Sequence, residues 1–524
     1  MAEPLFSLKP DSSERVSAGR MAPWEVGELP EPPAVRWTPR ALLGPGILMA
    51  GAAIGGGEWL IGPAITSQYG GTLMWIAFVS ILLQACYNQE VMRYTLYCGE
   101  PILTGCFRIR PGPSFWTCAY LLFDFGAIWP YLSANAAVPL TTAFLGHIPG
   151  AEVDLAGHAI LPATRASELA IKQWVSYGIF CTAFLPLIFG GKIYNALEKV
   201  MTVKLVLVLG YLTVIGVFYV APETWYRVFS GFIGSPGVRD GSFSLQWLPV
   251  LESGYHLDYA LLASLAAIAG VGGMGNSAFS VYCRDKGWGM GSQVGALPSA
   301  VGGITVKLSH VGKVFRVNDT NLDRWRGWLR VIHRDQWGIW VFGCVLGMAI
   351  PSLVSLQFIP ALGRPVTGDE LSAVTAQLIA EHTGLHLFWW LTLLCGFLAL
   401  APTQTVAIDG VIRRWTDIIW TGIPTMHRFD GHQVKYVYYG LLGVYWMFGL
   451  QVLIRFPNPL AMVKVASIIF NYALGFSALH TLVVNCTLLP PALRPRWGMR
   501  IALGCTALFF TVVAGIATVQ HLNR

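Results

Sequence analysis

Gly51-Ala-Ala-Ile-Gly-Gly-Gly-Glu-Trp59 lies near the middle of the first long apolar run of this sequence, where it places three consecutive glycines and a carboxylate. A second stretch, Gly270-Val-Gly-Gly-Met-Gly-Asn276, interrupts a later apolar run in the same way. Runs of glycine disfavour a continuous helix. Unwound backbone at membrane depth is tolerated only where it is buried in protein or lines a cavity. The two stretches therefore predict two broken helices that meet at a binding site.

The composition places both stretches in a membrane protein. Of the 524 residues, 54% are hydrophobic and only 12% are charged, and the mean hydropathy is +0.54. A soluble protein carries roughly twice that charged fraction. Many runs of about 20 residues lack a charge, which is enough to cross a hydrocarbon core of roughly 30 Å. We expect an all-α, integral, multi-pass protein in a lipid bilayer, the inner (plasma) membrane of a bacterium.

The apolar runs predict about eleven transmembrane helices. They are expected at 42–68, 72–96, 114–146, 169–190, 198–220, 257–283, 336–357, 385–408, 436–455, 459–486 and 498–520. Most of the 35 Lys and Arg residues lie in alternate connections, the longest of them at 284–335. Because basic residues favour cytoplasmic loops, the N-terminus is expected inside and the C-terminus outside.

The interrupted helices are the first and the sixth, as a 5+5 inverted repeat would place them. The expected organisation is a disordered cytoplasmic tail at 1–40, a first repeat at 41–220, a second repeat at 257–486, and an eleventh helix with the C-terminus at 487–524. Alternatively, the glycines serve only close helix packing, since Gly51 and Gly55 fit the small-xxx-small pattern. Packing requires neither three consecutive glycines nor a buried carboxylate.

The expected substrate-binding residues come from the two interruptions and from one polar position in the eighth span. They are Gly55, Gly56, Gly57, Glu58, Gly272, Gly273, Met274, Gly275, Asn276 and Gln404. An ionisable group near the bilayer centre is costly and predicts function, so Glu58 is expected to carry protons or to bind a cation. The alternative is that Glu58 caps the following half-helix. Gln404 could equally form a hydrogen bond between helices.

Other charged residues in the spans have both functional and structural interpretations. Asp124 is a second candidate for proton coupling, or it pairs with a lysine. Glu90 and Arg93 are three residues apart, which favours a structural ion pair on one helix. Lys204 and Lys464 are expected to snorkel towards their nearer membrane interfaces.

Several classes of function lack support in the sequence. It shows no nucleophile–base constellation and no P-loop, so we expect neither an enzyme nor a cofactor. The Gly270-x-Gly-x-x-Gly275 spacing resembles a dinucleotide fingerprint, but no strand precedes it. The basic connection at 284–335 follows the positive-inside rule, so no nucleic-acid partner is expected. The ten cysteines are scattered without a CxxC pair and are expected to be free thiols.

Three segments resemble the Nramp metal-transporter family. Gly44-Pro-Gly-Ile-Leu-Met-Ala50, with Trp59 and Ser67-Gln-Tyr-Gly-Gly-Thr-Leu-Met-Trp75, is similar to its first-helix region. Gly190-Gly-Lys-Ile-Tyr-Asn-Ala-Leu-Glu-Lys199 is similar to its connection between helices four and five. The resemblance implies a LeuT-type fold and proton-coupled uptake of divalent transition metals.

The ligand motifs of that family are altered in this sequence. Its Asp-Pro-Gly-Asn motif falls on Gly55-Gly-Gly-Glu58, so that Gly55 replaces the metal-binding aspartate and Glu58 replaces the asparagine. Its Met-Pro-His motif falls on Met274-Gly-Asn276, which keeps the methionine and loses the histidine. The metal ligands implied by the resemblance are therefore Glu58 and Met274. A site for Mn²⁺ or Fe²⁺ usually has more carboxylate or imidazole ligands.

The sequence thus predicts a secondary-active transporter of Nramp-like lineage. Ancestry indicates proton-coupled transport of a divalent metal ion. The altered motifs leave open a small organic solute, amino-acid-like or other, or a hydrated cation. A membrane sensor or scaffold without transport is a further alternative, because the basic segment 284–335 could dock a partner.

Overall fold

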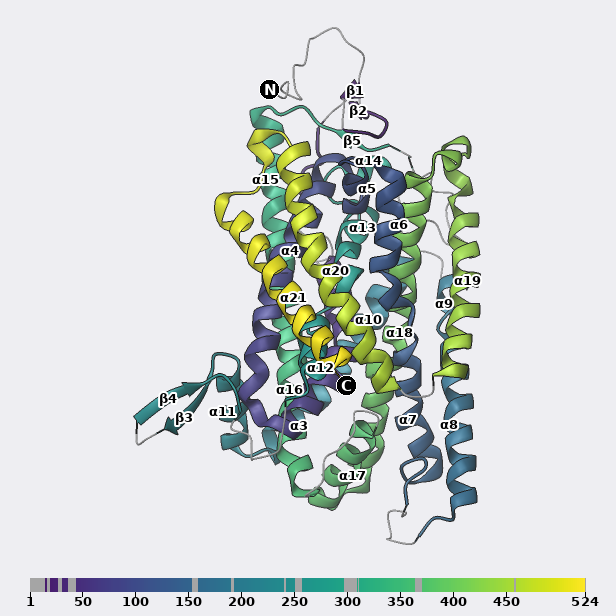
Figure 1. Ribbon diagram of the computed structural model, residues 1–524, viewed down its shortest axis with the longest axis vertical. Helices are drawn as coiled ribbons and strands as arrows, with labels where there is room; N and C mark the ends of the chain where they lie inside the picture. The colour runs from purple at the N-terminus through teal and green to yellow at the C-terminus, as the bar shows by residue number, and fades with distance from the viewer. Residues whose placement is uncertain are drawn as a thin grey trace.

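Long helices run side by side along the long axis of the protein in the computed structural model (Figure 1). The structure describes residues 15–16, 19–26, 31–35, 44–152, 159–189, 193–239, 242–249, 257–295, 309, 311–362, 370–456 and 459–523. Within these ranges, nine helical stretches are long and apolar enough to cross a membrane. The protein is therefore an all-α membrane protein, as expected.

The nine stretches relate simply to the eleven predicted helices. The first stretch, Pro45–Cys98, covers two predicted spans. The third predicted span is divided at residues 129–130, between a short 3₁₀ turn and the next helix. The number eleven, the N-in, C-out orientation and the repeat boundaries stay predictions.

The first half of the chain contributes helices on both sides of the first interruption. Its elements are α2 (Pro45–Ala53), η1 (Gly56–Ile61), α3 (Gly62–Tyr69), η2 (Gly70–Leu73), α4 (Met74–Cys98), α5 (Ile102–Phe107), α6 (Pro113–Phe123), η3 (Phe125–Ile128), α7 (Tyr131–Leu145), α8 (Pro162–Thr182), α9 (Leu185–Phe189), α10 (Ile193–Tyr219) and α11 (Pro222–Gly231). A hairpin of β3 (Ser235–Arg239) and β4 (Ser242–Gln246) follows at the end opposite the N-terminus (Figure 1).

The second half of the chain begins with the second interrupted helix. Its elements are α12 (Tyr259–Ile268), η4 (Gly273–Ser277), α13 (Ala278–Asp285), α14 (Gly291–Val294), α15 (Asp319–His333), η5 (Arg334–Val341), α16 (Phe342–Phe358), η6 (Ile359–Leu362), α17 (Leu371–Thr383), α18 (His386–Gly422), η7 (Pro424–Arg428), η8 (Gly431–Gln433), α19 (Val434–Arg455), α20 (Pro459–Leu488), η9 (Pro491–Leu493) and α21 (Trp497–Leu522). α18 continues through 409–422, a segment that the sequence placed in a cytoplasmic connection.

Both predicted interruptions are present, and they differ in form. α2 ends at Ala53, Gly55 is neither helical nor extended (φ −156°, ψ −100°), and the chain resumes as a π-helical turn. The second interruption is wider, because residues 269–272 are not helical. There Gly270, Gly272 and Gly273 have φ values of 104°, 82° and 56°. Only glycine adopts this left-handed region readily, which explains the glycine run.

The N-terminal residues pack against the helical bundle. β1 (Arg15–Val16) and β2 (Trp24–Val26) form a sheet with β5 (Lys313–Val314), in which β2 and β5 are parallel. We call the described residues 19–26 and 31–35 the N-terminal strap. Trp24 is fully buried in it. The sequence predicted a disordered tail at 1–40. In the strap the structure instead shows paired strands and a buried Trp24. The remaining residues of that segment lie outside the described ones.

A buried ion pair anchors the strap. The carboxylate of Glu100 pairs with the guanidinium of Arg108 and accepts hydrogen bonds from Tyr94 Oη at 2.7 Å and from Gly312 N at 2.8 Å. Arg108 also donates to the carbonyl oxygen of Ala22 in the strap, at 2.8 Å. Burial alone raises the pKa of Glu100, but the charge of Arg108 and these hydrogen bonds outweigh burial and lower that pKa below its ordinary value of 4.5.

We predict that Glu100→Gln destabilises the protein, because it leaves the buried Arg108 charge without a counter-ion, at a cost of about 3–5 kcal/mol. Since the pKa of Glu100 is lower in the folded state, the stability from its charge is present above pH 4.5 and is lost as the pH falls further. Thermal unfolding of the purified chain between neutral and acidic pH checks this. The difference between wild type and variant should shrink on acidification.

The matched control is Glu31→Gln, which removes a half-exposed partner of Arg324. An exposed ion pair contributes about 0–1 kcal/mol, so this variant should unfold nearly as wild type does. Equal unfolding temperatures for wild type and Glu100→Gln at neutral pH would contradict an anchoring role.

Candidate functional site

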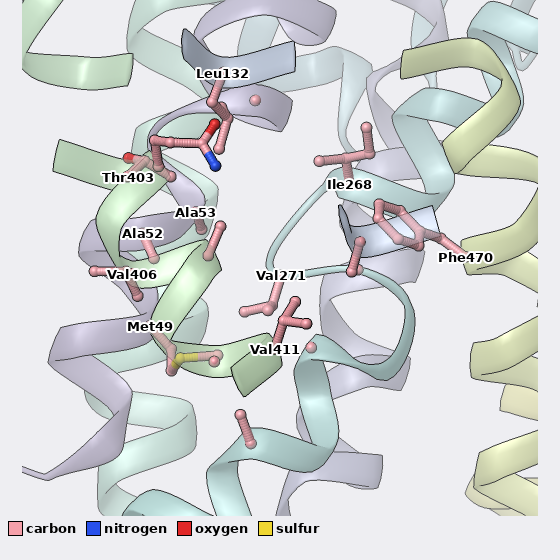
Figure 2. Close-up of a pocket in the computed structure, with 18 of the residues that line it drawn as sticks. Met49, Ala52, Ala53, Leu132, Ile268, Val271, Thr403, Val406, Val411 and Phe470 are labelled. Atoms are coloured by element: carbon pink, nitrogen blue, oxygen red, sulfur yellow. The ribbon is translucent and has the colours of Figure 1, made fainter. Parts of the chain in front are cut away.

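A cavity of about 100 Å³ lies between the two interruptions. This volume holds several water molecules, a partly hydrated ion or a small solute. Figure 2 shows apolar side chains around it from α2, the second interruption, α18, α7 and α20. The labelled residues are Met49, Ala52, Ala53, Leu132, Ile268, Val271, Thr403, Val406, Val411 and Phe470.

The structure divides the predicted substrate-binding residues into two groups. The residues that line the cavity are Gly56, Gly272, Gly275 and Gln404. The residues that lie at the interruptions but outside the lining are Gly55, Gly57, Glu58, Gly273, Met274 and Asn276. The cavity is thus bounded by backbone from both interruptions, while the polar side chains of the motifs lie behind that backbone.

The glycines allow the interruptions to touch. A Cβ atom on Gly57 would lie 2.1 Å from the carbonyl oxygen of Ile268, so the backbones of the two broken helices are in direct contact. A Cβ atom on Gly273 would lie 2.5 Å from the ring of Phe470. Gly57 and Gly273 thus allow close packing at the interruptions themselves. The alternative that the glycines serve only packing does not hold, because both helices are interrupted.

Glu58 joins the two interruptions. Its side chain is fully buried, and Oε1 accepts a hydrogen bond from the backbone N–H of Gly270 at 3.0 Å. Among the described residues, Oε2 has no hydrogen-bond partner. An unpaired oxygen on a buried carboxylate is costly to keep. This oxygen is therefore a candidate acceptor for a proton or a cation.

Lys204 lies beside the first interruption. Its side chain is buried, and Nζ donates to the hydroxyl of Thr403. Thr403 in turn packs against Gly55, where an added Cβ atom would come within 2.8 Å of its methyl group. Lys204 is close enough to Glu58 for the two charges to attract. The expectation that Lys204 snorkels to the interface is wrong, because Thr403 provides a partner inside the bundle.

Asn276 faces α4, away from the cavity. Its side-chain amide donates to Gln84 Oε1 at 3.0 Å and to Asn88 Oδ1 at 2.8 Å. Gln84 also donates to the carbonyl oxygen of Ala269 in the second interruption, at 2.7 Å. This pair on α4 was missed from the sequence, although Gln84 and Asn88 have the i, i+4 spacing of one helical face in an apolar span.

The metal-binding residues implied by the resemblance do not form a metal cluster with other strong ligands. Met274 is buried and lies outside the cavity lining. In the part of the chain that the structure describes, no three His, Cys, Asp or Glu side chains converge on one point. The histidine and aspartate that the family motifs would supply are absent from these positions, so Glu58 is left with neutral neighbours and Lys204.

Asp124 forms an ion pair with α18. Its carboxylate accepts from Arg414 at 2.8 and 3.1 Å and from Trp415 Nε1 at 2.9 Å. Arg414 also lines the cavity. Asp124 therefore forms an ion pair, as one of the two interpretations expected, but with an arginine and not with a lysine. Its role in proton coupling stays a prediction. Gln404, also in the lining, accepts at 3.2 Å from the backbone N–H of Ser133 and so joins α18 to α7.

A buried network of ion pairs ties α13 to α18 beyond the cavity. Arg284 pairs with Asp417 at 2.8 Å, and Arg413 pairs with Asp409 at 2.7 Å and with Asp285. All five side chains are nearly fully buried. This network holds α13 against α18. It was missed because the eighth span was expected to end at 408, before Asp409, Arg413 and Asp417.

Three simpler expectations about charged and thiol groups can be compared with the structure. The Glu90–Arg93 ion pair is confirmed, with a distance of 2.8 Å. Lys464 pairs with Asp258 at 2.7 Å. The ten cysteines are free, as expected.

Comparison with known proteins shows the fold. No protein-family model and no curated protein sequence matches this chain. It is similar to crystal structures of the manganese transporter of Eremococcus coleocola. A mutant form of that transporter has a TM-score of 0.58 and 13% identity, over 94% of this chain and 89% of the other. Its complex with an aromatic bis-isothiourea substituted compound has a TM-score of 0.58 and 13% identity, over 94% and 90%. The resemblance to the Nramp family is thereby confirmed at the level of the fold, while the 5+5 repeat stays a prediction.

We predict that Gly57→Ala disrupts the site, because the added methyl group would meet the backbone of Ile268. Overpacking of this kind costs about 1–3 kcal/mol, or more where the neighbour cannot move. Thermal unfolding of the purified chain measures the effect. The control is Gly210→Ala in α10, where nothing lies within 4 Å of an added Cβ atom. Equal destabilisation by both substitutions would show that the contact between the interruptions is not tight.

Proposed function

We propose that this chain is a secondary-active membrane transporter of Nramp lineage that binds its substrate between the two interruptions. The fold shared with a manganese transporter over 94% of the chain supports this proposal. The observation that carries it is the buried Glu58 carboxylate, which accepts a hydrogen bond from Gly270 across the two broken helices. Its other oxygen has no partner among the residues that the structure describes. A purely structural protein has no need for unwound backbone and an ionisable group at this depth.

The geometry suggests how a proton would be coupled to movement. Protonation of Glu58 removes the charge that strengthens its bond to the Gly270 amide and that attracts Lys204. The two interruptions are then held together less firmly. Opening towards the N-terminal end also requires α13 and α18 to separate at pairs such as Arg284–Asp417. In alternating access, the contacts of Glu58 and the ion pairs between α13 and α18 would break and form in turn.

The lineage indicates a divalent metal ion as substrate, with Glu58 and Met274 as its ligands. A small organic solute is the second candidate, and two observations favour it. The cavity lining is mostly apolar, with polar contributions from Thr403, Gln404 and Arg414. A lysine ammonium beside the first interruption also opposes a divalent cation and favours a carboxylate. Exposed backbone amides at a broken helix are suited to the same group.

Uptake into sealed proteoliposomes tests the proposal. We expect accumulation of one substrate class, driven by an inward proton gradient, with Mn²⁺ and a mixture of small amino acids as the first two arms. Thermal shifts of the purified chain with Mn²⁺, Mg²⁺ and the amino acids report binding independently, since a ligand at 100 times its Kd stabilises by about 2.7 kcal/mol. Binding of the amino acids without binding of Mn²⁺ would select the organic substrate. Absence of flux and binding in every arm would support the sensor alternative and refute transport.

We predict that Glu58→Gln abolishes proton-driven uptake and leaves the chain folded. The amide oxygen of glutamine can still accept from Gly270, so the contact between the interruptions is kept while the titratable group is lost. The measurement is uptake as a function of external pH. Glu381→Gln, on the exposed end of α17, is the matched control and should transport as wild type does. Unchanged pH dependence in Glu58→Gln would rule out Glu58 as the coupling group.

A further inference from the structure

A second pocket lies apart from the cavity, at the end of the bundle that carries the N-terminus. It has a volume of about 860 Å³ and lies between α15, the start of η5, and the turn that joins α20 to α21 (Figure 1). Its walls are basic. One wall carries Arg326, Arg330 and Arg334, and the other carries Arg494, Arg496 and Arg500.

The lining has a single sign of charge. Arg93 of α4 and His333 complete its basic groups, and no Asp or Glu among the described residues lines the pocket. Two of the arginines pair with carboxylates outside the lining, Arg93 with Glu90 and Arg326 with Asp323. An anion in the pocket would still be attracted by the excess of positive charge around it. Arginine binds phosphate through paired N–H donors, which makes phosphate a suitable anion.

Several of the guanidinium groups are fixed in place by the fold. Arg494 and Arg500 each donate through Nε to a carbonyl oxygen of their own connection, Leu489 and Pro495, at 2.9 Å. These bonds orient the side chains and use one of the five donors of each guanidinium. Arg93 is held by Glu90 at 2.8 Å and donates to the carbonyl oxygen of Leu493 at 3.2 Å. The pocket is therefore pre-organised, since its donors are in position before a ligand binds.

An exposed tryptophan beside the pocket indicates that it lies near the level of the lipid headgroups. α21 begins at Trp497 and is apolar enough to span the membrane. Trp497 is 75% exposed, and the guanidinium of Arg500 lies 4.9 Å from its ring centroid. Exposed tryptophans at the end of a span mark the interface between membrane and water. Basic pockets between spans at this level suit the headgroups of anionic lipids.

We propose that this basic pocket binds a phosphate group, with the headgroup of an anionic phospholipid as its source. The site is independent of the substrate cavity, so it stands whether or not the protein transports a metal. A bound headgroup would bridge α15 and the α20–α21 turn and hold these two elements together.

Thermal unfolding of the purified full chain in phosphatidylcholine nanodiscs tests the proposal. We expect phosphatidylglycerol to raise the unfolding temperature and zwitterionic phosphatidylethanolamine to leave it unchanged. Arg494→Gln combined with Arg496→Gln should weaken the response to phosphatidylglycerol about tenfold or more in apparent affinity. Arg110→Gln combined with Arg428→Gln removes the same charge from exposed positions outside the pocket and should respond as wild type does.

The remaining arms identify the source of the anion. If inorganic phosphate stabilises the chain as strongly as the lipid does, the pocket binds phosphate, but the proposal that a lipid headgroup supplies it is overturned. Stabilisation by polyglutamate, with no response to lipid or phosphate, would overturn the proposal in favour of an acidic protein partner. An unchanged response to phosphatidylglycerol in the double variant would also overturn it. If that variant does not fold, Arg326→Gln on the exposed face of α15 provides the same comparison.

Discussion

The hydrogen bond from the Gly270 amide to the Glu58 carboxylate joins two helices that are interrupted at the same place in the bundle. Non-helical backbone inside an apolar structure must satisfy its polar groups within the protein. Here Glu58 supplies one acceptor, and Gln84 supplies a donor to Ala269. The remaining architecture follows from this requirement, because α4 must present its amides to the second interruption and glycine must bring the two backbones into contact.

The need to satisfy the polar groups of the non-helical backbone also affects which substrates the cavity can bind. The cavity between the two interruptions is bounded mainly by backbone and apolar side chains. Arg414 lines this space, and Glu58 and Lys204, which have opposite charges, lie behind its backbone. A site of this kind offers a divalent cation little compensation for its lost hydration. The local chemistry therefore gives little support to a divalent metal ion as substrate.

The sequence was sufficient for features that depend on one segment at a time. The interruptions, the apolar spans and the Glu90–Arg93 pair all follow from glycine content, hydropathy or helical spacing. Contacts between segments far apart in the chain could not be predicted in this way. Asp124 and Arg414 are 290 residues apart, and hydropathy does not reveal which faces of α6 and α18 meet. Lys204 was misplaced for the same reason, since its partner Thr403 is on another helix.

The N-terminal strap also has a mechanical consequence. Residue pairing between β2 and β5 attaches the chain ahead of α2 to the segment that enters α15, while α2 itself ends at the first interruption. The first turn of α2 is itself attached to η5, because the backbone N–H of Gly46 donates to the carboxylate of Asp335 at 2.9 Å. A tilt of α2 about the first interruption would therefore act on η5 and on α15, which directly precedes it. The N-terminal strap is in this sense part of the structure that holds the start of α15 in place.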